Sequence, residues 1–144
     1  MLARFLALLL WLHPVASVAQ GAAAPDATPE DRAAIKSVIE RQLAAFASDD
    51  GEAAFAFASP AIRGLFGTAE NFMAMVRDGY RAVYRPRSVA FSDLVEAGGT
   101  LIQLVDLVGP DDAPVVAAYE MLRLPDRSWR INGCTLLRSP ARRI

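Results

Sequence analysis

Histidine and cysteine are almost absent from this chain of 144 residues. It contains one histidine, His13, and one cysteine, Cys134. Since His13 lies in an N-terminal apolar run typical of a cleaved leader, the mature chain has no histidine. This composition excludes Ser-His-Asp and Cys-His catalysis, histidine-ligated metal sites and an internal disulfide. We therefore expect neither a metal nor a cofactor.

The first 19 residues have the order of a secretory signal. A short positively charged start is followed by the mostly apolar Phe5–Ala16 and then by the small residues Ser17–Ala19. The apolar run is too short to span a bilayer comfortably, so no stable membrane anchor is expected after cleavage. We predict cleavage after residue 19, with Ala22 or Ala24 as alternatives. The predicted location is periplasmic or secreted.

The chain also has no large excess of positive or negative charge, since its formal net charge is −1. A near-neutral chain of mixed signs does not have the basic surface of a nucleic-acid-binding protein, and no nucleic-acid partner is expected. We divide the chain into a signal peptide (1–19), a disordered mature N-terminus (20–28), one domain (29–138) and a C-terminal tail (139–144). Without a disulfide, that domain depends on an apolar core, which its length can supply.

The first half of the domain has the signals of helices. Apolar residues at three- and four-residue spacing predict a helix over 29–47. Asp49 and Glu52 have the spacing of a capping box for a second helix over 51–58. The adjacent acids Asp49 and Asp50 have two interpretations, a helix cap with a turn or a carboxylate pair for acid–base chemistry, and capping is favoured.

Two further helices follow in the sequence. Ser59 can cap a short helix that has Pro60 at its first position. A longer helix is predicted from Thr68 until Pro86 stops it, because proline disfavours the helical conformation at the residue before it.

From residue 87 the chain has the pattern of a β-meander. Strands are predicted over 88–97, 100–108, 115–124 and 129–137. The pair Gly98-Gly99 suits a tight hairpin turn, and Gly133 inside the last strand indicates a bulge or a close backbone approach. Helices followed by strands predict an α+β fold, with N-terminal helices packed on one face of a curved four-stranded antiparallel sheet.

Three stretches carry a resemblance to a known family: DDGEAAFAFASPAIRGLFG, NFMAMVRDGYRAVYRP and YEMLRLPDRSWRINGC. Over about residues 30–138 the chain resembles an uncharacterised bacterial family, domain of unknown function 4864. The resemblance implies the nuclear transport factor 2-like, or cystatin-like, cone fold, with a pocket between the helices and the concave face of the sheet. It implies no reaction, because cone-fold proteins include isomerases, dehydratases, ligand carriers and interaction domains.

The candidate ligand-binding residues are Arg63, Tyr80, Tyr84, Gln103 and Tyr119. Arg63 stands among apolar residues, where it either recognises an anion or binds helix-end carbonyls or a nearby acid. The tyrosines at 80 and 84 share one helix face, and either donate a hydrogen bond in the pocket or belong to the core.

Two other polar residues have a chemical interpretation. Asp106 is a general-base candidate if it points into the cone and a solvated surface acid if it does not; alternation alone does not decide its face. Cys134 is expected to be buried and inert, since a nucleophilic thiol needs a cationic neighbour that lowers its pKa.

These observations favour a noncatalytic module that binds a small apolar or anionic ligand, or a partner protein. One alternative is an isomerase- or lyase-like enzyme that uses Asp106 with Tyr84 or Tyr119. Another is an interaction domain that forms a homodimer through the open face of its sheet. Only the first alternative requires an acid and a tyrosine to meet in the pocket.

Overall fold

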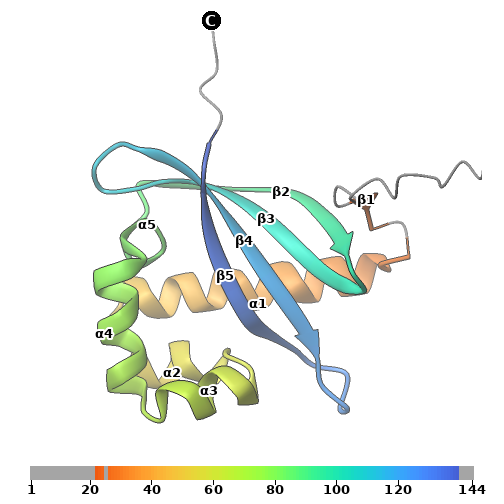
Figure 1. Cartoon of the computed structure of the whole chain (residues 1–144), viewed down its shortest axis with the longest axis horizontal. Coiled ribbons are helices and arrows are strands. Elements are labelled where there is room, and N and C mark those ends of the chain that lie inside the picture. The colour runs from red at the N-terminus through yellow and green to blue at the C-terminus, as the bar shows by residue number, and fades with distance from the viewer. Residues whose placement is uncertain (1–21, 25, 140–144) are drawn as a thin grey trace, which may run out of the picture.

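The α+β fold with four long antiparallel strands is confirmed by the computed structural model, which describes residues 22–24 and 26–139 (Figure 1). The elements are β1 (Ala22–Ala23), α1 (Pro29–Ala47), α2 (Gly51–Ala56), α3 (Pro60–Phe66), α4 (Ala69–Gly79), α5 (Arg81–Tyr84), β2 (Ser88–Ala97), β3 (Thr100–Val108), β4 (Pro114–Arg123) and β5 (Trp129–Arg138). The predicted signal peptide and residues 140–144 of the tail lie outside the described residues.

The starts of α1 and α3 are those expected from the sequence. Thr28 caps α1: its hydroxyl accepts a 3.0 Å hydrogen bond from the amide of Asp31, whose carboxylate accepts one from the Thr28 amide in return. Ser59 caps α3 by accepting a 3.3 Å hydrogen bond from the amide of Ile62. Both predictions are confirmed because capping depends only on residues close in sequence.

The cap of α2 is Asp50, so the expected capping box of Asp49 and Glu52 is wrong. The Asp50 carboxylate accepts a 3.1 Å hydrogen bond from the amide of Ala53. Asp49 has φ +52°, in the left-handed region. The turn that ends α1 therefore uses one more residue than expected, and it directs the Asp49 side chain toward Arg85 at 2.9 Å.

The long helix expected from Thr68 to Pro86 is interrupted at Tyr80. Its backbone leaves the helical region there, with φ −132° and ψ 49°, which separates α4 from α5. The Tyr80 hydroxyl donates a 3.0 Å hydrogen bond to the carbonyl of Cys134 on β5. Gly79, a poor helix former, precedes the break, and the bond to β5 holds it.

The sheet has the order β1-β2-β3-β4-β5, and every pair is antiparallel. The bounds of β2 and β3 are those predicted, whereas β4 begins and ends one residue earlier than expected and β5 ends one residue later. Gly98 and Gly99 have φ of +57° and +81°, the left-handed values that a two-residue hairpin turn requires.

Part of the stretch 20–28, which we expect from the sequence to be disordered, lies along β2. The backbone at Ala23 pairs with Val95 on the edge strand β2, and the next amide, of Ala24, donates a 3.1 Å hydrogen bond to the carbonyl of Leu94. Ala24 is only 1% exposed. Backbone bonds to β2 thus position a segment whose small residues have no structural preference of their own.

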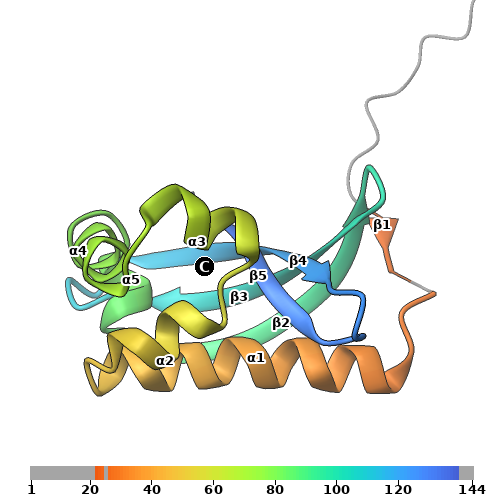
Figure 2. The same cartoon turned by 90° about the horizontal axis from the view of Figure 1, so that it is seen from below.

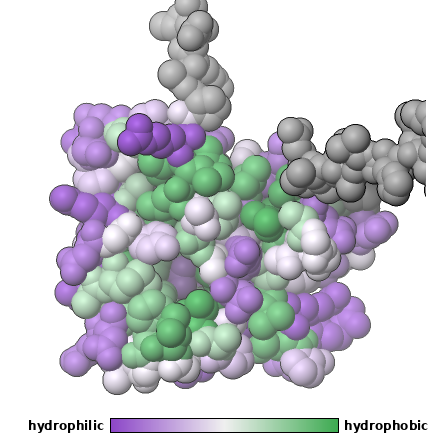
Figure 3. Space-filling model, viewed as in Figure 1, coloured by the Kyte–Doolittle hydropathy of each residue, from purple (hydrophilic) through white to green (hydrophobic). Residues whose placement is uncertain are grey.

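The two faces of the sheet differ in what covers them. On the inner face, α1 crosses the strands (Figures 1 and 2) and covers the buried residues Val105, Leu107, Ala117, Tyr119 and Met121. The outer face carries Ile102, Leu104, Asp106, Val116, Ala118 and Glu120. Figure 3 shows hydrophobic areas on this side of the molecule with hydrophilic residues between them.

A backbone connection joins the segment between α2 and α3 to the edge of β5. The amide of Ile131 donates to the carbonyl of Phe57 at 2.9 Å, and the amide of Ser59 donates to the carbonyl of Ile131 at 2.8 Å. The register between β4 and β5 shifts at the next residue, because Met121 pairs with Ile131 while Glu120 pairs with Gly133. The bulge expected near Gly133 is confirmed, and it fixes α3 beside β5.

Candidate functional site

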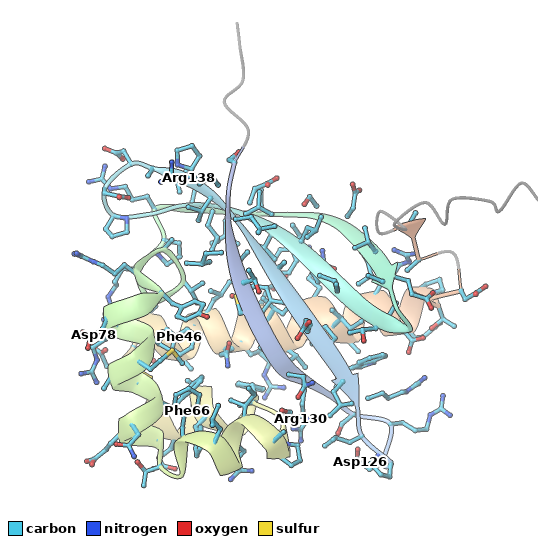
Figure 4. All side chains as sticks on the ribbon, in the orientation of Figure 1. Phe46, Phe66, Asp78, Asp126, Arg130 and Arg138 are labelled. Atoms are coloured by element: carbon cyan, nitrogen blue, oxygen red, sulfur yellow. The ribbon has the colours of Figure 1, made fainter. Side chains whose placement is uncertain are left out.

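A pocket of about 440 Å³ lies between α3, α4 and the β5 side of the sheet. Phe46 and Phe66 lie in the region between α4 and β5 in Figure 4. The lining is mostly apolar and includes Phe46, Ile62, Leu65, Phe66, Met75 and Ile131. Leu65 is 74% exposed, which places an uncovered apolar side chain at the opening.

An aromatic cluster fixes the helices around this pocket. The ring of Phe72 on α4 lies 6.0 Å from Phe46 of α1, 5.4 Å from Phe55 of α2 and 5.7 Å from Phe66 of α3, measured between centroids. These separations are those of favourable aromatic pairs. One side chain of α4 therefore contacts all three preceding helices, so the alternating Ala and Phe of the second helix serve packing.

Tyr119 is one of the residues that line the pocket, and its hydroxyl is buried. Its side chain is 1% exposed, and its hydroxyl has no hydrogen-bond partner among the described residues. The thiol of Cys134 lies beside it, without a well-formed hydrogen bond between the two. Burial raises the pKa of Tyr119 well above 10.0, so the hydroxyl keeps its proton and remains a donor.

Tyr80 also lines the pocket, but its hydroxyl is already bonded to the carbonyl of Cys134. Burial raises the pKa of Tyr80, with a smaller contribution from Cys134. Burial likewise raises the pKa of the Cys134 thiol to about 12, against a smaller lowering by Tyr119. The thiol is therefore protonated at neutral pH, as expected of an inert cysteine.

Glu120 is the only charged residue among the described residues that line the pocket. It projects from the outer face, opposite Gly133 on β5. A Cβ on Gly133 would lie 2.6 Å from Oε2 of Glu120, so this carboxylate lies across the glycine. Sequence reasoning did not select Glu120 as a site residue; the unusual glycine in the paired strand was the available signal.

Arg63 and Gln103 do not line the pocket. The guanidinium carbon of Arg63 lies 5.3 Å from the ring centroid of Phe55, on the exposed side of α3. Gln103 is buried, and its Nε2 donates to the carbonyls of Ser92 and Leu104 at 3.1 and 2.9 Å. Since β2 changes register beside it, Gln103 satisfies backbone groups at that irregularity.

Tyr84 belongs to a separate surface cluster. Its hydroxyl donates to Asp49, and the Arg85 guanidinium lies 3.9 Å from its ring centroid. The bond to Tyr84, followed by the charge of Arg85, lowers the pKa of Asp49, and the same bond raises the pKa of Tyr84. Because the helix breaks at Tyr80, the two tyrosines do not share one face as expected.

The acid expected to work with a tyrosine lies on the wrong face of the sheet. Asp106 is exposed on the outer face, whereas Tyr119 is buried on the inner face and pairs with Gln103. The predicted acid–tyrosine pair therefore does not form with Asp106. Within residues 22–24 and 26–139, no group of three or more His, Cys, Asp or Glu side chains is placed to hold a metal ion. None of the helices in this part of the chain is long and apolar enough to cross a membrane.

Comparison with known proteins gives one family match. The model of a domain of unknown function, DUF4864, matches residues 28–144. Comparisons with curated proteins and with solved structures found no match. The family match includes every helix and strand that surrounds the pocket, and its description names no ligand and no reaction.

Proposed function

This chain belongs to the DUF4864 family, and we propose that it is a noncatalytic module that binds a small, mostly apolar molecule. The pocket of about 440 Å³ carries this proposal. Its size is in the range of small-molecule sites, and such sites are lined by apolar and aromatic side chains with few polar groups. Release of ordered water from this lining would supply most of the binding free energy.

The proposal includes two finer features. The order of helices and meander, with a pocket beside the sheet, supports a nuclear transport factor 2-like or cystatin-like cone. The order of charge, apolar run and small residues within residues 1–19 supports export to the periplasm or out of the cell. Export would give the module access to apolar molecules outside the cytoplasm.

Titration with 1-N-phenylnaphthylamine, a neutral apolar dye that fluoresces when it leaves water, tests the proposal. The protein should increase the fluorescence of the dye in a saturable manner. Met75→Trp should reduce this response at least tenfold, because the larger ring occupies the pocket that Met75 lines. Ala74→Trp is the matched control, since Ala74 is the exposed neighbour on the same helix.

The two tryptophan variants separate pocket binding from binding to the surface. A dye response that both variants retain would place the dye outside the pocket and contradict the proposal. Absence of a saturable response in the unmodified protein would contradict it as well. Circular dichroism of both variants checks that the helices persist.

A homodimer through the outer face remains a prediction. This face and its rim carry exposed apolar side chains, among them Leu137 at 48% and Leu122 at 37% exposure. Sedimentation velocity at micromolar concentration measures the assembly directly. A monomer at every concentration would contradict the dimer without affecting the proposed pocket.

A further inference from the structure

We infer that the ligand is a neutral molecule with a hydrogen-bond acceptor, such as the carbonyl of a ketone, aldehyde or ester, and that the Tyr119 hydroxyl donates to it. The inference rests on the proposed function, because it names the chemistry of the molecule bound in the same pocket. Two observations support it: an unpaired donor in the interior and the charges along the pocket wall.

The donor is the first observation. A buried hydroxyl without a partner is unfavourable, and native proteins pair nearly all such groups. The Cys134 thiol beside Tyr119 is only a weak hydrogen-bond partner, and no other partner for the hydroxyl is found among the described residues. Tyr119 stays protonated, so its buried O–H proton lacks an acceptor. A carbonyl oxygen on an apolar molecule meets this requirement, and because the hydroxyl is inaccessible in the unbound protein, neighbouring side chains of the lining move aside when the ligand binds.

The charges of the lining are the second observation. No Arg, Lys or His stands among the described residues that line the pocket, and the one charged group is the carboxylate of Glu120. An anion that enters an apolar pocket loses its hydration and needs a cation in compensation. Arg63, which we expected to recognise an anion, lies instead over the ring of Phe55. A neutral ligand is therefore favoured over a carboxylate.

Three ligands of nearly the same shape test both observations: 2-acetylnaphthalene, 2-isopropylnaphthalene and 2-naphthoate. The ketone has a neutral hydrogen-bond acceptor, the hydrocarbon has no acceptor, and the naphthoate is an anion. Their affinities are measured by displacement of 1-N-phenylnaphthylamine. We expect the ketone to bind about fivefold more tightly than the hydrocarbon, as one net hydrogen bond provides. The naphthoate should bind most weakly.

Two conservative variants assign the effects to residues. Tyr119→Phe should reduce the ratio of ketone to hydrocarbon affinity about fivefold, because only the hydrogen bond is lost. Glu120→Gln should raise the affinity for naphthoate without changing that for the ketone. Asp106→Asn is the matched control for the latter, since it removes one negative charge from the outer face away from the pocket and should change neither affinity.

The outcomes separate this inference from the proposed function. Equal affinity for ketone and hydrocarbon, unchanged in Tyr119→Phe, would overturn the role of Tyr119 while leaving an apolar pocket intact. Tightest binding of naphthoate would overturn the neutral ligand. Failure of all three ligands and of the dye to bind would overturn both the inference and the proposed function.

Discussion

The hydroxyl of Ser59 donates a 2.7 Å hydrogen bond to Oδ1 of Asn132, which joins the N-cap of α3 to the bulge of β5. Ser59 is completely buried, and its amide is bonded to the carbonyl of Ile131. The same hydroxyl accepts a hydrogen bond from the amide of Ile62 at the first turn of α3. One small side chain thus fixes a helix start, a strand irregularity and one wall of the pocket.

Ser59→Ala should lower the free energy of unfolding by about 2 kcal/mol, from a lost cap and an unsatisfied Asn132 side chain. Urea unfolding measures this loss. Thr68→Ala is the control, because Thr68 caps α4 by accepting the amide of Asn71 and its hydroxyl makes no long-range bond among the described residues. The control should lose about 1 kcal/mol. Equal losses would show that the bond to Asn132 contributes nothing.

The cluster of Asp49, Tyr84 and Arg85 should make stability depend on pH. In the folded protein the pKa of Asp49 is below its ordinary 3.8. Its contribution to the free energy of unfolding is therefore present above pH 3.8 and is lost as the pH falls through the lowered pKa. Tyr84 has a folded pKa above its ordinary 10.0, so its contribution is present below pH 10.0 and is lost as the pH rises through the raised pKa. The cluster is therefore stabilising between these limits.

Asp49→Asn tests this dependence, since asparagine tolerates the left-handed backbone found at that position. The variant should melt at a lower temperature than the unmodified protein at pH 7, and the difference should decrease toward pH 2. Asp50→Asn is the control, because asparagine is an equally good N-cap for α2. Thermal melts at pH 2, 4 and 7 are the measurement. A difference that does not change with pH would exclude the charge of Asp49 as its cause.

Gly133→Ala should be tolerated, whereas Gly99→Ala should not. The methyl at 133 would meet the end of the flexible Glu120 side chain, which can move away, so we expect a loss below about 1 kcal/mol. Gly99 has open space around it but φ +81°, so alanine there should cost about 1 kcal/mol or more through backbone strain. Urea unfolding of both variants shows which substitution lowers the free energy of unfolding more. The reverse order would mean that Glu120 is held rigidly over β5.

The N-terminal sequence predicts a specific mature N-terminus. After expression of the full chain in a host with a secretory pathway, mass spectrometry of the exported protein should give a first residue of Gln20. A chain that keeps Met1 in the cytoplasm would contradict export. Replacement of Leu8 and Leu9 by Arg, which interrupts the apolar run, should abolish cleavage and thereby show that the run is the signal.

Local signals predicted much of the fold. Thr28 and Ser59 mark helix starts because a cap satisfies amides two or three residues away. Gly98 and Gly99 mark the hairpin because few other residues adopt the backbone angles found there. The break at Tyr80 could not be predicted in this way, because the bond that holds it comes from Cys134, 54 residues later.

The candidate site was predicted less well, for a related reason. Tyr80 and Tyr119 line the pocket, but alternation along a strand does not say whether an inward side chain meets a cavity or a backbone group. Gln103 points inward and bonds to the irregular β2. Glu120 reaches the pocket only because Gly133 pairs with it, and this pairing depends on a bulge that shifts the register.

The contacts at both edges of the sheet have a consequence for solubility. An uncovered edge strand can template the addition of strands from other chains, which leads to aggregates. On one side the backbone at Ile131 is bonded to the segment between α2 and α3, and on the other Ala23 pairs with Val95. At these positions another strand would first have to displace the covering segments. The bonds that position the pocket wall therefore also oppose the pairing of another chain with β5 at Ile131.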